Sequence, residues 1–321
     1  MSTTLGMEPL TDPATVRLEH ATLDGETLVF EHPGGLERAL RMGFLLVRAP
    51  DDLALEPALT LARHFNEPRG RFRDGRDAYR GFREAGPFCF DRSEYQVEQL
   101  IIGREERERL LPPDALAVTT RMSEMAVSIL RGLLRWYGID EALWDQVSGG
   151  CASGRGTHWF VANRYDPEAS GLGCAPHTDT GFVTVLYADR PGLEVGIDGH
   201  WTPLECRPRS FVVNFGVALE TLSRHMSTPA CAALHRVATT TPTLDGPPRV
   251  SIAAFASAPT HGVLYEIAPD GSAAAVHDVD TLLQAHDAGT WKTGRGPDQA
   301  RSAESARETT RTALETSRLG A

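Results

Sequence analysis

The sequence predicts a mainly β fold in which helices from the first half of the chain pack on a jelly-roll core. From Thr157 onward, short apolar and β-branched runs alternate with turns, which is typical of a β-sandwich or jelly roll. The first half instead contains stretches with apolar residues at helical spacing. We expect a single domain in 321 residues, with a mixed helix and strand region at 1–150, the core at 151–270 and a C-terminal tail at 271–321.

Helices and strands are predicted in order along the first half. Gly35–Met42 is expected to form a helix that leads into a buried strand at Gly43–Val47, and Asp52–Phe65 has apolar residues at helical spacing. The segment 66–112 is rich in arginine, glycine and acidic residues and lacks clear periodicity. We expect a long loop there, and loops of this length in a compact domain usually carry function.

One long helix and one hairpin are the clearest local predictions. Asp114–Tyr137 places apolar residues on one stripe, with Asp114 as a plausible N-cap, and the stripe is expected to pack on a sheet. In the second half, Leu193–Ile197 and His200–Pro203 are separated by Asp198-Gly199. Because these two residues adopt positive φ values readily, the pattern predicts a β-hairpin with a two-residue turn.

Composition restricts the possible partners and compartment. The formal net charge of −11 argues against nucleic acid or an anionic membrane as the main partner. No apolar stretch is long enough for a transmembrane helix, and the N-terminus lacks the order of a signal peptide, so we expect a cytoplasmic protein. The 5 cysteines include no Cys-x-x-Cys pair and are expected to be reduced. Lys292 is the single lysine among 32 basic residues, a bias typical of a GC-rich bacterial genome.

His177, Asp179 and His235 form the most informative pattern in the sequence. Residues two apart on a strand point to the same side, so His177 and Asp179 can bind one metal ion together. Two imidazoles and one carboxylate on one face of a metal suit non-haem Fe(II), because the opposite positions stay open for a cosubstrate and O2. Other histidines fit this order less well. The alternative third ligands would be His158, His200, His225 and His261, whereas His64, His277 and His286 are expected to be surface residues.

A second pair of polar residues opens a later predicted strand. Arg249 and Ser251 share one face of that strand, and a guanidinium binds a carboxylate through two charge-assisted hydrogen bonds to which a hydroxyl adds a third. Asn163 and Tyr165 also share a face, just before Pro167. The sequence therefore predicts a three-ligand metal site that is followed along the chain by an anion-binding pair.

These motifs, in this order, resemble the isopenicillin-N-synthase-like family of 2-oxoglutarate-dependent Fe(II) oxygenases. The resemblance implies a double-stranded β-helix core, an oxygenase domain with its metal site at 151–270, and Fe(II), 2-oxoglutarate and O2 as cofactor and cosubstrates. It also implies that Arg249 and Ser251 bind the distal carboxylate of 2-oxoglutarate, with Tyr165 and Asn163 contributing. Val217 departs from the family pattern, which often has Asp there. The matching segments are Asn163–Pro167, His177–Leu186, Gly192–Val195, Asp198–Trp201, Phe211–Gly216, Leu234–Val237 and Arg249–Phe255.

The resemblance implies the hydroxylation, desaturation or cyclisation of a small metabolite. We expect the substrate to be a carboxylate-bearing compound of bacterial specialised metabolism, such as antibiotic biosynthesis. Arg80 is the candidate substrate anchor, since Tyr79–Phe82 resembles the region where some family members bind a substrate carboxylate. Because Asp179 is present, halogenation is disfavoured. Two alternatives stay open, namely a 2-oxoglutarate-independent Fe(II) oxidase of the isopenicillin N synthase type and a non-catalytic metal-binding jelly-roll module. The oligomeric state is not predicted.

Overall fold

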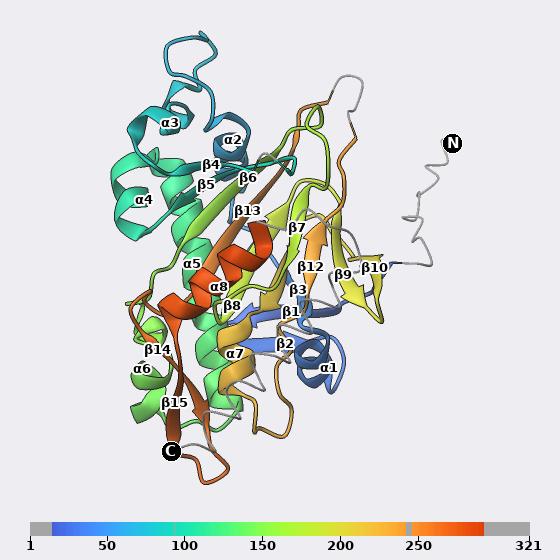
Figure 1. Cartoon of the computed structure of the whole chain (residues 1–321), viewed down its shortest axis with the longest axis vertical. Coiled ribbons are helices and arrows are strands. Elements are labelled where there is room, and N and C mark those ends of the chain that lie inside the picture. The colour runs from blue at the N-terminus through green and yellow to red at the C-terminus, as the bar shows by residue number, and fades with distance from the viewer. Residues whose placement is uncertain (1–14, 93, 242–245, 292–321) are drawn as a thin grey trace, which may run out of the picture.

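Two β-sheets that face each other form the centre of the computed structural model, which describes residues 15–92, 94–241 and 246–291 (Figure 1). Within these ranges the larger sheet has nine strands in the order β2-β1-β3-β11-β8-β13-β6-β5-β4. They are β2 (Thr27–Phe30), β1 (Glu19–Asp24), β3 (Phe44–Arg48), β11 (Ser210–Phe215), β8 (Val183–Ala188), β13 (Arg249–Ala256), β6 (Phe160–Tyr165), β5 (Val97–Ile102) and β4 (Cys89–Asp91). The smaller sheet has the order β10-β9-β12-β7. Its strands are β10 (His200–Pro203), β9 (Leu193–Ile197), β12 (His235–Val237) and β7 (Cys174–His177).

The space between the two sheets holds one apolar core. Phe44 and Val212 from the larger sheet pack there with Val195 and Val237 from the smaller sheet, and each is less than a tenth exposed. Side chains alternate across a strand, so one face of each sheet is free to build this interior. The facing sheets confirm the predicted mainly β fold with a jelly-roll core.

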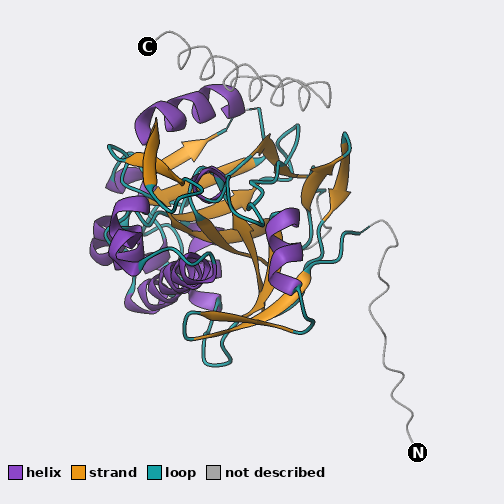
Figure 2. Ribbon diagram, turned by 90° about the horizontal axis from the view of Figure 1, so that it is seen from below, coloured by secondary structure: helices purple, strands orange, loops and turns teal. Residues whose placement is uncertain are grey.

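A second core lies on the outer face of the larger sheet, where helices cover it (Figure 2). Helices α5 (Pro113–Trp136) and α2 (Glu56–His64) pack on strands β13, β8 and β6. On α5 the buried residues Met122, Ile129 and Leu133 recur at helical spacing. The helix predicted at Asp114–Tyr137 is therefore confirmed, although Asp114 lies inside its first turn and Pro112 is the N-cap.

The other local predictions have mixed outcomes. Helix α1 has the predicted bounds Gly35–Met42, and the hairpin β9–β10 turns at Asp198 and Gly199, whose φ angles are 49° and 79°. The prediction of a long loop over 66–112 is wrong from Phe82 onward. The structure has β4 and β5 there, with helices α3 (Phe82–Ala85) and α4 (Arg104–Leu110).

The C-terminal third completes the described fold. Helix α7 (Val217–Leu222) follows β11, and strands β14 (Val263–Ile267) and β15 (Ala273–Asp278) form a separate hairpin. Helix α8 (Val279–Trp291) then contacts β15 and β7. Both β15 and α8 fall in the segment predicted as a tail, whose remainder lies outside the described residues. The short helix α6 is Trp144–Val147. In the ranges that the structure covers, no helix has the length and apolar character needed to cross a membrane.

Candidate metal centre

Two strands of the smaller sheet bring the three predicted metal ligands together. His177 ends β7 and His235 begins β12, and the antiparallel register places these two residues opposite each other. Asp179 lies two residues beyond His177. Its Oδ1 is 3.7 Å from Nε2 of His177 and 3.9 Å from Nε2 of His235. Within the described part of the chain, these residues are the one group of His, Cys, Asp and Glu side chains arranged to hold a metal ion.

Backbone carbonyls orient both imidazole rings in the same way. Nδ1 of His177 lies 2.8 Å from the carbonyl oxygen of Ala175, and Nδ1 of His235 lies 3.0 Å from that of Ala233. With Nδ1–H donating, each Nε2 carries the lone pair that a metal requires. Burial, together with the neighbouring His177, lowers the pKa of His235 to about 4. His235 is therefore neutral near pH 7, as a metal ligand must be.

Side chains of the larger sheet fix the carboxylate of Asp179. Its Oδ2 accepts hydrogen bonds from Oγ1 of Thr184 at 2.5 Å and from Nδ2 of Asn214 at 2.7 Å, which leaves Oδ1 directed at the imidazoles. Burial raises the pKa of Asp179, but the two histidines and the two hydrogen bonds outweigh it, and the net pKa is lowered. Thr184 and Asn214 were not assigned roles from the sequence, although both lie within the quoted motifs.

The backbone around Asp179 is also held by the end of β11. The amide of Val217 donates to the carbonyl oxygen of Asp179 at 2.8 Å. Gly216 permits this approach, because a Cβ atom there would lie 2.7 Å from the same oxygen and 2.2 Å from that of Gly181. Val217, where the family often has Asp, therefore still holds the backbone of Asp179 through its own amide.

The second predicted group gathers on adjacent strands β6 and β13. Arg249 pairs in register with Tyr165, and Ser251 pairs with Asn163. Oγ of Ser251 lies 3.2 Å from the hydroxyl oxygen of Tyr165 and accepts a hydrogen bond from Nδ2 of Asn163, also at 3.2 Å. The guanidinium of Arg249 stands 4.5 Å from the centre of the Tyr165 ring. All four side chains are less than a tenth exposed.

Arg249 retains a hydrogen-bond donor without a protein partner. Its Nε donates to the carbonyl oxygens of Arg190 and Pro191 at 3.2 and 3.0 Å, which orients the guanidinium. Its Nη1 is buried and has no partner among the described residues. A buried donor that lacks a partner is costly, so a bound anion is the chemical group that would satisfy it.

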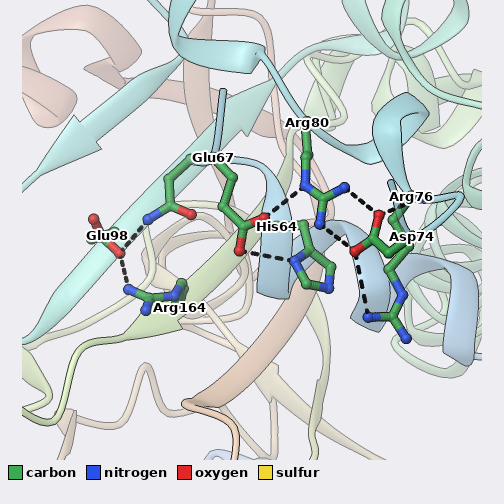
Figure 3. Close-up of polar contacts among 8 residues, drawn as sticks. His64, Glu67, Asp74, Arg76, Arg80, Glu98 and Arg164 are labelled. Carbon is green, nitrogen blue, oxygen red and sulfur yellow. Dashed lines mark hydrogen bonds and ion pairs between the residues drawn. The ribbon is translucent and has the colours of Figure 1, made fainter. Parts of the chain in front are cut away.

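Arg80, the predicted substrate anchor, is the buried centre of a cluster of charged residues whose other members are partly exposed (Figure 3). Its Nε donates to Glu67 at 2.6 Å, and its two terminal nitrogens donate to Asp74 at 2.6 and 2.7 Å. The guanidinium also stacks on Phe72, and the side chain is 1% exposed. Because every nitrogen of Arg80 already has a carboxylate partner, this geometry does not support the predicted role as substrate anchor.

His286 differs from its predicted place at the surface. Helix α8 carries it to the metal centre, where its ring centre lies 6.1 Å from that of His177. Its side chain is about one fifth exposed, at 21%. No local sequence pattern indicates this contact, because α8 and β7 are far apart along the chain.

A family model and several known proteins are similar to the part of the chain that contains this site. Residues 156–258, which contain the three candidate ligands, match the family model described as the 2OG-Fe(II) oxygenase superfamily. The chain is 33% identical over 135 residues to mugineic-acid 3-dioxygenase of Hordeum vulgare, a match that covers 41% of this chain and 36% of that protein. The matched segments span 22 to 36% of the length of the first three curated relatives.

Solved structures share the fold over most of the chain. The structure of JOX2 in complex with 2OG, Fe and JA has a TM-score of 0.61 and 18% identity, and the match covers 85% of each chain. The dioxygenase for auxin oxidation in rice has a TM-score of 0.59 and 23% identity, with 84% of this chain and 94% of that chain covered. These likenesses extend the similarity beyond the segment that the family model matches.

Proposed function

We propose that the chain is a non-haem Fe(II)- and 2-oxoglutarate-dependent dioxygenase, since its residues 156–258 match the model of the 2OG-Fe(II) oxygenase superfamily. The observation that carries this proposal is the convergence of His177, Asp179 and His235, whose donor atoms all lie within 4.8 Å of one another. The buried donor of Arg249 is the second support.

The donor set fits Fe(II). His177 and His235 would bind through Nε2 and Asp179 through Oδ1, since the other polar atoms of these side chains are already engaged. Two imidazoles and one carboxylate are the ligand set of the non-haem Fe(II) oxygenases. When bound, Fe(II) supplies the activation of O2 that is coupled to conversion of 2-oxoglutarate to succinate and CO2.

The remaining polar residues would hold 2-oxoglutarate by its distal carboxylate. The guanidinium of Arg249 would bind it in a planar fork, and Ser251 and Tyr165 would donate hydroxyl hydrogens. Burial raises the pKa of Tyr165, so its hydroxyl keeps its proton and can donate. Asn163 would orient Ser251 through the hydrogen bond between them.

The proposed reaction is hydroxylation, desaturation or cyclisation of a small, carboxylate-bearing metabolite in bacterial specialised metabolism, such as antibiotic biosynthesis in the cytoplasm. The names of the relatives support a small organic molecule as the substrate, because they refer to mugineic acid, hyoscyamine and flavonol. Asp179 supplies the carboxylate ligand, which favours oxygenation over halogenation.

The test measures O2 consumption and succinate formation after anaerobic loading with Fe(II). The proposal predicts that both require Fe(II) and 2-oxoglutarate and rise when a substrate is added. O2 consumption without 2-oxoglutarate would instead identify an oxidase of the isopenicillin N synthase type. Iron binding without any O2 consumption, across a panel of carboxylic acids, would identify a non-catalytic module.

A further inference from the structure

Arg92, between β4 and β5, is a partly buried cation that has no ion-pair partner among the described residues. Its Nε donates to Oε1 of Gln99 at 3.1 Å, and its guanidinium lies 3.9 Å from the ring centre of Trp291 and 5.4 Å from that of Phe90. No carboxylate oxygen of the described residues lies within 4.0 Å of it, and Asp287 acts on it only over a longer distance. Arg80, by contrast, has two carboxylate partners.

A chain of hydrogen bonds connects Arg92 with the interior of the jelly roll. Nε2 of Gln99 donates to Oδ1 of Asn163 at 3.0 Å, and Asn163 donates to Ser251. Gln99, Asn163 and Ser251 are register neighbours on the adjacent strands β5, β6 and β13. Arg92 therefore lies at the rim of the same interior that contains the anion site of Arg249.

Helix α8 contacts both Arg92 and the metal centre. Trp291 at its end stacks on Arg92, and His286 packs edge-on against the metal ligand His177. Five residues of helix separate the two contacts, a rise of about 8 Å. The helix lies in front of the sheets in the view of Figure 1, where it contacts β7.

We infer that Arg92 is the substrate-positioning residue, which binds a carboxylate of the substrate beneath α8 while the other end of the substrate meets the metal centre. This inference rests on the proposed function and names its substrate class as an organic anion. A guanidinium that is partly removed from water without a counter-ion is less favourable than a paired one, and a carboxylate corrects this through charge-assisted hydrogen bonds. Trp291 holds the guanidinium plane in place by stacking on it.

The test uses the full chain loaded with Fe(II) and saturating 2-oxoglutarate without O2, so that Arg249 is occupied. Phenylacetate is the probe, phenylacetamide is its neutral counterpart, and tryptophan fluorescence is the readout because Trp291 stacks on Arg92. One charge-assisted contact with a stacked ring corresponds to a Kd on the order of 1–10 mM for phenylacetate. The neutral amide is expected to bind at least about tenfold more weakly, because it lacks the charge.

Four variants separate the inference from general damage. Arg92→Gln is expected to weaken phenylacetate binding about tenfold, and Arg92→Lys is expected to recover part of it because the charge remains. Trp291→Phe is expected to remove the fluorescence change. The matched control is Arg135→Gln, since Arg135 also stacks on a tryptophan, Trp144, but is paired with Glu26 and Glu141 and lies on α5.

Unchanged affinity in Arg92→Gln would overturn the inference, as would equal binding of acid and amide or no phenylacetate binding at about ten times the expected Kd. Iron content and 2-oxoglutarate affinity are measured on the same samples. If the unmutated protein binds neither iron nor 2-oxoglutarate, the proposed function is contradicted. If it binds both but does not bind phenylacetate, only the role of Arg92 is contradicted.

Discussion

His235 is the ligand that best tests the metal centre, because it lies on β12, whereas His177 ends β7 and Asp179 follows two residues later. His235→Ala is expected to abolish turnover and to lower the iron content after anaerobic loading to near background, since two remaining ligands hold a labile divalent ion poorly. His200→Ala is the matched control, because His200 is exposed on β10. An alanine variant at 235 that keeps both iron and turnover would refute the assignment.

The donors to Asp179 give a second prediction at this scale. Thr184→Val keeps the shape of the side chain but removes the hydrogen bond to Oδ2 of Asp179. Loss of such an outer contact typically weakens metal binding by about 10- to 100-fold, and we expect a fall in this range in an Fe(II) titration. Thr119→Val on α5 is the control, because Thr119 is equally buried but its hydroxyl bonds only within its helix. Equal iron affinity in the two variants would contradict the role of Thr184.

Arg249 is expected to control cosubstrate affinity and not metal affinity. Arg249→Ala removes hydrogen bonds to a charged partner worth about 1.5–3 kcal/mol, so the KM for 2-oxoglutarate should rise roughly 10- to 150-fold. The iron content should not change. Arg209→Ala serves as control, because Arg209 is a surface residue whose side chain donates to the carbonyl of Pro50. If 2-oxoglutarate dependence is unaffected in Arg249→Ala, another residue holds the distal carboxylate.

Strand periodicity explains which site residues could be predicted from the sequence. His177 and Asp179 are two residues apart, as are Arg249 and Ser251, so each pair is visible in the local pattern. Thr184 and its cross-strand neighbour Asn214 are brought together only by the register of β8 and β11. His286 and Arg92 depend on where α8 docks, and no local rule gives that position.

At the scale of elements, the cluster around Arg80 stabilises the segment 66–81. Arg80→Gln is expected to lower the Tm by an amount on the order of 5 °C, because Glu67 and Asp74 lose their shared partner. Arg83→Gln should change it little, since Arg83 makes a largely exposed pair with Asp91. Differential scanning calorimetry measures both. An unchanged Tm with a raised substrate KM would instead restore Arg80 as the substrate anchor.

The same cluster makes the effect of Arg80→Gln depend on pH. The hydrogen bond from Arg80 holds the pKa of Asp74 well below its ordinary value, and Glu67 has a lowered pKa because Arg80 and His64 outweigh its burial. Carboxyl groups with a lowered folded-state pKa stabilise the protein above their ordinary pKa of about 4, and this contribution is lost as the pH falls below it. The Tm difference between the two proteins should therefore be full at neutral pH and shrink below about pH 4. A difference that does not change with pH would contradict this account.

Elements were predictable where turn chemistry or helical periodicity was strong. The hairpin at Asp198-Gly199 and helix α1 have the predicted bounds. Strand β5 was missed because the polar Gln99 occupies one of its buried positions, where it bonds to Asn163, so apolar and polar residues do not alternate. The segment 271–321 was expected to be a tail, yet α8 within it contacts β7.

For the whole molecule, the larger sheet joins both halves of the chain. Strand β3 from the first half pairs with β11 from the second half, and β5 pairs with β6. Helices α2 and α5 then cover the outer face. The sheet that supports the metal centre therefore includes strands from both halves of the described chain, and the first half supplies strands as well as covering helices.

The edge of Phe44 meets the ring of His235 at 5.6 Å between centres. This contact joins a strand near the start of the chain to a ligand in its last third, and such distant pairings form late in folding because closing long loops costs entropy. The metal pocket therefore matures only as the native topology is completed. Iron binding during refolding should therefore report the completion of the native topology. We expect it to occur later than the recovery of the helical circular dichroism signal.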